Sequence, residues 1–342
     1  VMQLNMLISM KSIRAKYSLS KYIRIKMAYL KSKPIDLVSN IYHVITSKKL
    51  SPRLIIISPT NVCNANCIFC AYQYYKKPKI NMDIDIMKKT LYEAKVLSIP
   101  KIGITPLVGE ILTDKTIINK LKIIGSYKFD SVTAFTNLLG LHKFDTGEFI
   151  NIGITGLHVS TSPLRKELYE KIYRNKKYDI FLKNLINLLK EFNLGRTTIK
   201  TITIEFRSSL SLKDCLELDD FQKHIKPLIK DNVKVNAITK FDSWMGAIKK
   251  EDLLDGMTLE KPAGKKIVPC WRLSNIQVLS NGDIRVCGCR FNSSSGKDIF
   301  YIGNMKTVSI EDAYNSDTVK NLKKSFLKNN PPYECQICSW YC

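Results

Sequence analysis

The chain of 342 residues lacks any long apolar run, and its clean apolar stretches are short, such as the segment 54–57. A membrane-spanning helix needs about 20 apolar residues, so we expect none here. Gln3 and Asn5 interrupt the apolar first ten residues and no positive charge precedes them, which argues against a secretory signal. The sequence also lacks internal repeats and low-complexity linkers. We therefore expect a cytoplasmic protein.

Acidic residues are few, because 30 Asp and Glu face 54 Lys and Arg, for a formal net charge of +24. Residues 1–53 concentrate the excess, with eleven Lys or Arg and the single acid Asp36. Apolar residues recur at helical spacing on both sides of Pro34, which predicts two amphipathic helices. A basic helix can meet nucleic acid or an anionic membrane surface. A solvated face in a Lys-rich chain is the simpler interpretation.

Histidine is scarce too, and His43, His142, His158 and His224 show no metal-ligand spacing. Cysteine is clustered instead, with nine of the ten residues in two groups: Cys63, Cys67 and Cys70, then Cys270, Cys287, Cys289, Cys335, Cys338 and Cys342. A chain with 45% hydrophobic residues can build a core without disulfides. Gaps of two and three residues favour metal ligands over buried structural thiols. The tenth residue, Cys215, stands alone and is expected to be such a structural thiol.

From residue 54 onward, short β-branched runs alternate with longer helical stretches. The expected strands are 54–58, 101–105, 131–135, 156–160, 198–206 and 233–239, and the expected helices are 84–97, 114–124, 164–173, 179–192 and 214–230. Six successive βα units predict a parallel sheet, as a partial barrel or a doubly wound layer. In the fifth strand Ile202, Ile204 and Phe206 alternate with polar residues. Because a fully buried parallel strand is apolar on both faces, this alternation predicts a hydrophilic lumen.

Near residue 265 the pattern changes to a hairpin and one helix. Two β-type segments flank Asn281–Gly282, a strong hairpin signal. Ser309 and Asp312 then begin a helix expected to reach Leu327 in capping-box style, before a Cys-rich tail. We expect a basic helical segment (1–53), a core domain (54–264) and a small C-terminal α+β domain (265–342).

The first cysteine group follows the first strand and reads Cys63-Asn-Ala-Asn-Cys67-Ile-Phe69-Cys70. Three thiolates can hold three irons of a [4Fe–4S] cubane, which normally has four thiolate ligands. The fourth iron is then open to an outside chelator. Zinc is the competing interpretation, but a structural zinc site needs four ligands and no His or fourth Cys lies nearby.

This Cys-x3-Cys-x2-Cys loop, with Phe69 before its last cysteine, resembles the signature of the radical S-adenosylmethionine (radical SAM) superfamily. The resemblance covers about residues 54–240 and implies an α/β fold, a partial (β/α)6 TIM-like barrel. It also implies a [4Fe–4S] cluster on Cys63, Cys67 and Cys70 that binds S-adenosylmethionine. One-electron reduction, from a donor such as flavodoxin or ferredoxin, would then yield a 5′-deoxyadenosyl radical that abstracts a substrate hydrogen.

The resemblance implies further contacts to S-adenosylmethionine. Leu107-Val108-Gly109-Glu110 stands where the family has Gly-Gly-Glu, so Glu110 would meet the methionine amino group although Val replaces the first glycine. The remaining candidates lie at or after the third and fourth strands, together with the aromatic residue of the cysteine loop: Phe69, Asn137, Ser160, Thr161, Ser162 and Arg174. Capping or turn roles are the alternative for Asn137 and the serines.

The second cysteine group resembles the SPASM/Twitch extension of radical SAM enzymes, in which a hairpin and a helix hold auxiliary clusters. Two full cubanes need about eight thiolates, and this region offers six. The resemblance therefore implies one auxiliary [4Fe–4S] cluster. Its expected ligands are Cys270, Cys287, Cys335 and Cys338, with Cys289 and Cys342 as alternates.

The implied activity is that of a radical SAM oxidoreductase or modifying enzyme whose auxiliary cluster accepts an electron from a substrate radical. Residues 1–53 are too short for a peptide-binding domain, which favours a sugar or other small molecule over a peptide. Glu205, Arg207 and Tyr72 are the lumen candidates for proton transfer or substrate anchoring. One alternative is an RNA-modifying radical enzyme, suggested by the positive charge. Another is a nonenzymatic iron–sulfur or zinc scaffold, which would form no 5′-deoxyadenosine.

Overall fold

A single curved sheet of nine strands organises the protein, whose computed structural model describes residues 34–46, 48–262, 264, 266–288 and 298–341. The strand order is β11-β10-β9-β1-β2-β3-β4-β5-β6. The strands are β1 (Ile55–Ile57), β2 (Lys101–Ile104), β3 (Ser131–Thr136), β4 (Gly156–Thr161), β5 (Thr201–Arg207), β6 (Val233–Ile238), β9 (Ile276–Val278), β10 (Asp283–Val286) and β11 (Tyr301–Asn304). A separate parallel pair joins β7 (Lys240–Phe241) to β8 (Thr258–Leu259).

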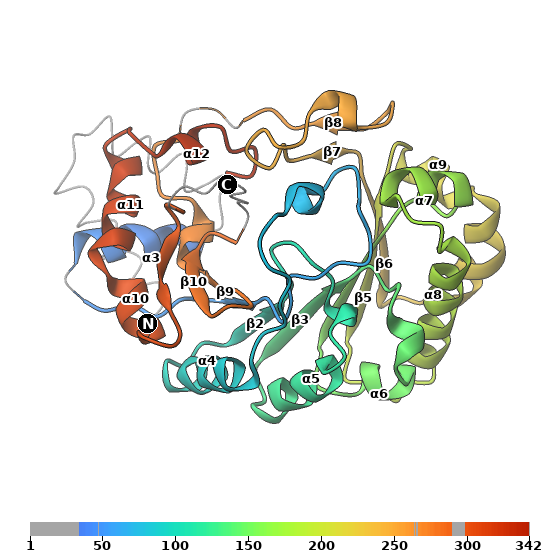
Figure 1. Ribbon diagram of the computed structural model, residues 1–342, viewed down its shortest axis with the longest axis horizontal. Coiled ribbons are helices and arrows are strands. Elements are labelled where there is room, and N and C mark those ends of the chain that lie inside the picture. The colour runs from blue at the N-terminus through green and yellow to red at the C-terminus, as the bar shows by residue number, and fades with distance from the viewer. Residues whose placement is uncertain (1–33, 47, 263, 265, 289–297, 342) are drawn as a thin grey trace.

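The six strands β1 to β6 are parallel neighbours in chain order, as six successive βα units predict. Figure 1 shows them as an arc, with helices on its outer side and the loop after β1 on its inner side. The helices between them are α4 (Ile84–Val96), α5 (Ile117–Ser126), α6 (Thr146–Ile150), α7 (Lys166–Tyr173), α8 (Tyr178–Asn193) and α9 (Leu212–Leu216). The expected partial (β/α)6 barrel is confirmed. No described helix is long and apolar enough to cross a membrane.

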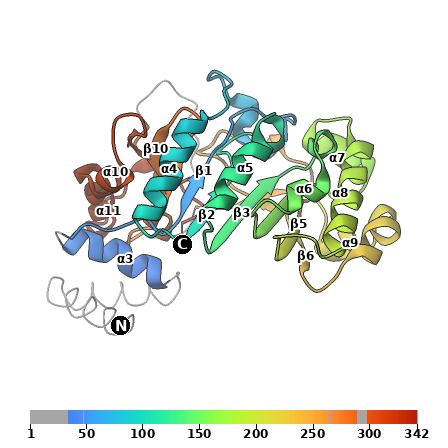
Figure 2. The same cartoon turned by 90° about the horizontal axis from the view of Figure 1, so that it is seen from below.

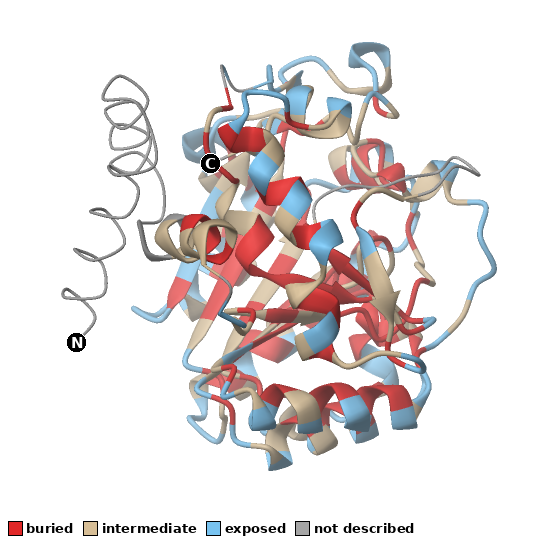
Figure 3. Cartoon of the chain, turned by 90° about the vertical axis from the view of Figure 1, so that its left-hand side faces the viewer, coloured by how far each residue is buried: buried red, intermediate tan, exposed pale blue. Residues whose placement is uncertain are grey.

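The core lies between the outer face of the sheet and these helices. In β5 the side chains of Ile202, Ile204 and Phe206 are fully buried, whereas Glu205 and Arg207 on the other face are partly exposed. Strands β3 and β4 repeat the alternation. Figure 3 shows buried residues along the strands and exposed residues on the outer turns of the helices. Apolar residues therefore face the helices, and polar residues face the inside of the arc.

The C-terminal hairpin extends the sheet instead of forming a separate layer. Strand β9 pairs in parallel with β1, and β10 returns antiparallel to β9. Gly282 has φ +88° at the turn, a conformation that favours glycine, which explains the hairpin signal. The helices that follow are α10 (Ile310–Asn315), α11 (Asp317–Leu327) and α12 (Tyr333–Gln336).

Two helices expected to be continuous are broken. Segment 214–230 contains the end of α9, a π turn (Phe221–Ile225) and a short 3-10 turn (Lys226–Leu228) instead of one helix. Pro227, which has no backbone N–H to donate, lies in the last of these turns. The expected helix from Ser309 to Leu327 is interrupted at Ser316, whose extended ψ of 156° ends α10 and begins α11. The side chain of Asn315 hydrogen-bonds both backbone groups of Leu50, so a tertiary contact holds this bend.

Helix α3 (Pro34–Ile45) lies against the C-terminal part of the chain, as Figures 1 and 2 show. Asn40 donates from Nδ2 to the Cys270 carbonyl at 2.8 Å, and His43 Nδ1 lies 2.8 Å from the Nζ of Lys323 in α11. This is the second of the two helices expected near the N-terminus; the first lies outside the described residues. Its contacts join α3 to the region that carries the second cysteine group.

Candidate functional site

The loop that follows β1 carries the first cysteine group and is held by its neighbours. The backbone N–H groups of Asn66 and Ile68 donate to carbonyls at the end of α7, at 3.2 and 2.9 Å. The Tyr72 hydroxyl accepts from the Cys63 N–H at 3.0 Å, so Tyr72 braces the loop. The short turn that begins after Cys70 continues this bracing, since the Cys70 sulfur accepts from the Tyr72 N–H at 3.5 Å.

Cys63, Cys67 and Cys70 are free thiols within mutual electrostatic reach. Burial raises the pKa of Cys63 to about 12. It raises the pKa of Cys67 well above its usual range, and the neighbouring Cys70 and Cys63 raise it further. Removing these protons therefore needs a bound cation, which thiolate-ligated iron supplies.

Among the described residues, no group of three or more His, Cys, Asp or Glu side chains is placed to hold a metal ion. A cubane differs because each thiolate binds its own iron, so its ligands stand farther apart than those of one tetrahedral ion. Three neighbouring thiols on one braced loop provide three such ligands.

A cavity of about 320 Å³ opens beside Cys70, inside the arc and near the carboxyl ends of the strands. Of the residues expected at the S-adenosylmethionine site, it is lined by Phe69, Glu110, Asn137 and Ser160, and of the lumen candidates by Arg207. Carboxyl ends of parallel strands are the usual place for binding sites in α/β proteins. The loops after β1, β2 and β3 and the carboxyl ends of β4 and β5 thus bring these residues together.

Glu110 is fully buried at this cavity and is held by three donors. Thr136 Oγ1 and the Asn137 N–H donate at 2.6 Å, to Oε1 and Oε2 respectively, and the Leu112 N–H donates to Oε1 at 3.1 Å. A carboxylate can accept about four hydrogen bonds, so Oε2 keeps room for another donor. The buried carboxylate can therefore order the ends of β2 and β3 and still accept from a ligand.

Burial raises the pKa of Glu110 to about 7 from an ordinary 4.5, although its hydrogen bonds pull the pKa down. The stability linked to this shift is fully present below about pH 4.5 and is lost as the pH rises through about 7. In the protein without bound cofactors, this shift should lower the free energy of unfolding by about 3 kcal/mol between pH 4.5 and pH 8. The Glu110→Gln variant should lack this decrease. Urea unfolding at the two pH values measures the difference. Equal pH dependence in the two proteins would contradict the shift.

Ser160, Arg207 and Phe69 form a second side of the cavity. Arg207 donates from Nε to Ser160 Oγ at 3.2 Å, and its Nη2 lies 2.5 Å from a carboxylate oxygen of Glu205. The guanidinium carbon is 5.9 Å from the centre of the Phe69 ring. Arg207 also lowers the pKa of Cys67 and Cys70, although burial outweighs this effect. A cation therefore lies within reach of both the thiols and the cavity.

Three sequence candidates lie elsewhere. Ser162 is buried outside the cavity and donates to the Pro163 carbonyl at 3.0 Å, while Thr161 is buried in β4. Arg174 is exposed at the end of α7, where Nη1 donates to the Gln73 side chain at 2.9 Å. Arg207 is thus the arginine that lines the cavity.

Other residues that line the cavity carry no motif in the sequence. They are Lys240, Asp242 and Trp244 after β6, together with Gln277, Gly288 and Trp340 from the C-terminal region. Trp244 Nε1 donates to the Phe69 carbonyl at 3.0 Å, which ties this segment to the cysteine loop. The sequence gives no signal for them, because they are far from the cysteine loop along the chain and only the fold brings them to the cavity.

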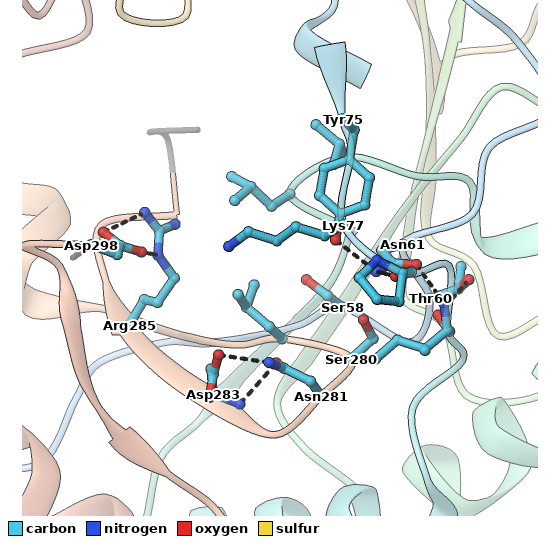
Figure 4. Close-up of a pocket in the computed structure, with 15 residues that line it drawn as sticks. Ser58, Thr60, Asn61, Tyr75, Lys77, Ser280, Asn281, Asp283, Arg285 and Asp298 are labelled. Carbon is cyan, nitrogen blue, oxygen red and sulfur yellow. Dashed lines mark hydrogen bonds and ion pairs between the residues drawn. The ribbon is translucent and has the colours of Figure 1, made fainter. Parts of the chain in front are cut away.

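A second cavity, of about 210 Å³, adjoins the first along Leu107 and Val108. Figure 4 shows Lys77 reaching into it from one side, opposite the ion pair of Arg285 with Asp298. Ser58 lines this cavity and accepts at 2.9 Å from Gln277 Nε2, which lines the first. Polar side chains therefore continue from the first cavity toward the hairpin.

The four residues expected to hold an auxiliary cluster line one small cavity: Cys270, Cys287, Cys335 and Cys338. They come from the turn before β9, the end of β10 and the segment after α11, so the hairpin and helix bring them together. Cys287 has φ +62°, an uncommon conformation for a non-glycine residue that tends to occur at functional sites. A donor set of four cysteines suits a fully ligated cubane. Cys289 and Cys342 lie outside the described residues.

Comparison with known proteins supports the interpretation of the second cysteine group. Residues 270–340 match the family model SPASM, an iron–sulfur cluster-binding domain. SuiB of Streptococcus suis, solved bound to its precursor peptide SuiA, matches with 17% identity and a TM-score of 0.62, over 91% of this chain and 76% of SuiB. No curated protein sequence matches.

Two further solved structures are similar. BtrN in complex with AdoMet and 2-DOIA shares 14% identity, a TM-score of 0.52 and coverage of 82% of this chain and 89% of BtrN. anSMEcpe with bound AdoMet shares 11% identity, a TM-score of 0.51 and coverage of 84% and 89%. At these identities the likeness concerns the fold.

Fold and site together define a partial (β/α)6 barrel joined to an iron–sulfur cluster-binding domain. The SPASM family model confirms the expected iron–sulfur cluster-binding domain at the C-terminus, and the similar solved structures confirm the expected barrel fold.

Proposed function

We propose that the protein is a radical SAM enzyme that cleaves S-adenosylmethionine reductively and abstracts a hydrogen atom from a polar substrate. The main support is the loop that presents three free thiols, Cys63, Cys67 and Cys70, next to a cavity lined by Cys70. When bound there, a [4Fe–4S] cluster on Cys63, Cys67 and Cys70 supplies the electron that turns S-adenosylmethionine into a source of 5′-deoxyadenosyl radical. Flavodoxin or ferredoxin would be the donor, in the reducing cytoplasm.

In this proposal the cavity residues hold the two charged ends of the methionine part. Glu110 accepts a hydrogen bond from the ammonium group through Oε2, where it has acceptor capacity left. Arg207 binds the carboxylate, because its guanidinium faces the cavity near the thiols and carries several donors. Asn137 and Ser160 would hydrogen-bond the ribose or the carboxylate, and Phe69 forms part of the cavity wall. Their role is to position the ligand and exclude water.

A binding measurement can show whether Arg207 or Arg174 binds S-adenosylmethionine. Arg207→Gln is expected to raise the Kd for S-adenosylmethionine at least tenfold, about 1.4 kcal/mol, because a charge-assisted hydrogen bond is lost. Arg174→Gln is the matched control and should change the Kd less than twofold, since Arg174 is exposed and bonded to Gln73. Anaerobic equilibrium dialysis with labelled S-adenosylmethionine measures both. The reverse ranking would restore Arg174 as the ligand-binding residue.

We further propose one auxiliary [4Fe–4S] cluster on Cys270, Cys287, Cys335 and Cys338. Its place in the enzyme would be to accept one electron after hydrogen abstraction and loss of a proton, which gives a two-electron oxidation of the substrate. Support comes from the convergence of the four side chains on one cavity and from the iron–sulfur domain model. The residues between the clusters, Gln277 and Gly288, would then face the substrate.

The proposed substrate is a sugar, another small polar molecule or a peptide. Similar structures include complexes with 2-DOIA, with the precursor peptide SuiA and with the Cp18Cys peptide. Glu205 and Arg207 remain the proposed lumen residues for proton transfer or anchoring. Tyr72, which braces the cysteine loop, is a weaker candidate.

Anaerobic reconstitution tests the function directly. The loaded protein should hold about eight irons and convert S-adenosylmethionine to 5′-deoxyadenosine when dithionite is added. Deuterated candidate substrates should then pass label into 5′-deoxyadenosine. A protein that holds iron but forms no 5′-deoxyadenosine would be the nonenzymatic scaffold.

A further inference from the structure

Arg272 follows directly after Cys270 and lines the same small cavity as the four cysteines of the C-terminal region. Its guanidinium lies between two indole rings, with its central carbon 4.6 Å from the ring centre of Trp271 and 4.9 Å from that of Trp340. Two aromatic faces at this distance fix a planar cation in place. The orientation of Arg272 toward the cavity is therefore built by its neighbours.

The Nε–H of Arg272 is buried and has no hydrogen-bond partner within the described part of the chain. Burying such a donor without an acceptor costs about 1–3 kcal/mol, so an acceptor is expected beside it. The cavity wall has no acidic side chain among its described residues, and its sulfur-bearing members are the four cysteines. An acceptor rich in sulfur and negative charge would satisfy this donor.

Lys266 is a buried cation on the other side of the loop that carries Cys335 and Cys338. Its Nζ donates to the Gln336 and Cys338 carbonyls at 2.8 and 2.7 Å and also to the Cys335 carbonyl. Its side chain thus holds the loop of Cys335 and Cys338 and adds positive charge where these thiolates would bind. A cubane with four thiolates carries net negative charge, which increases on reduction, so nearby cations favour the reduced form.

We propose that Arg272 donates a hydrogen bond from Nε to a sulfur atom of the auxiliary cluster and, together with Lys266, raises its reduction potential. This inference rests on the proposed auxiliary cluster. The expected result is a cluster fitted to accept one electron, since hydrogen bonds to sulfur and added positive charge both stabilise the reduced state. Arg272 is a positioning and tuning residue and takes no part in bond breaking.

The test measures the midpoint potential of the auxiliary cluster by redox titration with paramagnetic resonance, in the full chain with Cys63, Cys67 and Cys70 replaced by alanine. Arg272→Met should lower the potential, changing the reduced-to-oxidised ratio at a fixed potential about tenfold, or 59 mV for one electron. Arg272→Lys keeps the charge and should shift it less. Arg165→Met is the control, because Arg165 is exposed at the start of α7, and should leave the potential unchanged.

The outcomes separate this inference from the function on which it rests. A potential of Arg272→Met equal to that of the unsubstituted background, at about four irons per chain, would overturn the inference and leave the auxiliary cluster standing. If the Arg272→Met variant loses its iron, the Arg272→Lys variant is measured instead. A midpoint potential of Arg272→Lys equal to that of the unsubstituted background would overturn the hydrogen bond to sulfur. A lower midpoint potential would support it. A background protein that holds no cluster would contradict the proposed auxiliary site itself.

Discussion

Replacing Cys63, Cys67 and Cys70 together by alanine is expected to abolish 5′-deoxyadenosine formation, with a loss of at least about a thousandfold. Each thiol holds one iron in the proposed cluster, so without the three thiols the protein holds no cluster whose open iron could bind S-adenosylmethionine. Iron should fall from about eight to about four per chain, because the auxiliary ligands are untouched. Iron assay and chromatography of the anaerobic reaction measure both quantities.

Cys215→Ala is the matched control for this experiment. Cys215 is buried in α9, and its sulfur lies 3.2 Å from the Ser208 hydroxyl, away from both cysteine-lined cavities. Its loss should cost about 1 kcal/mol of stability and leave iron content and cleavage unchanged. Persistent cleavage in the triple alanine variant would show that the cluster loop has been misidentified.

Replacing Cys335 and Cys338 by alanine should have the second large effect. Iron is expected to fall by about four per chain while 5′-deoxyadenosine is still formed, because the first cluster keeps its ligands. Formation of oxidised product should fall at least about a hundredfold, since the electron acceptor is lost. Parallel assays of iron, 5′-deoxyadenosine and substrate product test this separation.

Ser339→Ala is the control from the same loop. Ser339 donates to Asp242 at 2.7 Å and is no expected ligand, so iron should stay at about eight. If instead the double cysteine variant keeps all its iron, other thiols complete the set, with Cys289 and Cys342 as the candidates named from the sequence. That result would correct the ligand assignment and leave the first cluster in place.

Helix α3 bears on how the chain divides into domains. The proposed division at residues 53/54 and 264/265 follows the change of pattern in the sequence. The sheet crosses the second boundary through the pairing of β9 with β1, and α3 contacts the C-terminal region through Asn40 and Lys323. Asn40 binds the carbonyl of Cys270, so the N-terminal helix supports an expected auxiliary ligand. The C-terminal region therefore packs against α3 as well as against β1.

Local patterns indicated much of this arrangement. The alternation in β5 predicted its two faces, and the Asn281–Gly282 pair predicted the hairpin, because both effects act over a few neighbouring residues. The helix from Ser309 to Leu327 was wrong as one element, since its break at Ser316 depends on a contact between Asn315 and the distant Leu50. Local preference cannot report such a contact.

The first cysteine group could be recognised from the sequence as a metal-ligand candidate, because three cysteines at short spacing lie on one loop wherever that loop is placed. The sequence also determined the order of strands and helices, through periodicities that arise within each segment. Only the tertiary structure decided that Arg207 faces the cavity while Arg174 does not, and that Arg272 and Lys266 lie beside the second cysteine group. Those contacts join residues far apart along the chain, and they follow from how the sheet curves and how the C-terminal segment packs against it.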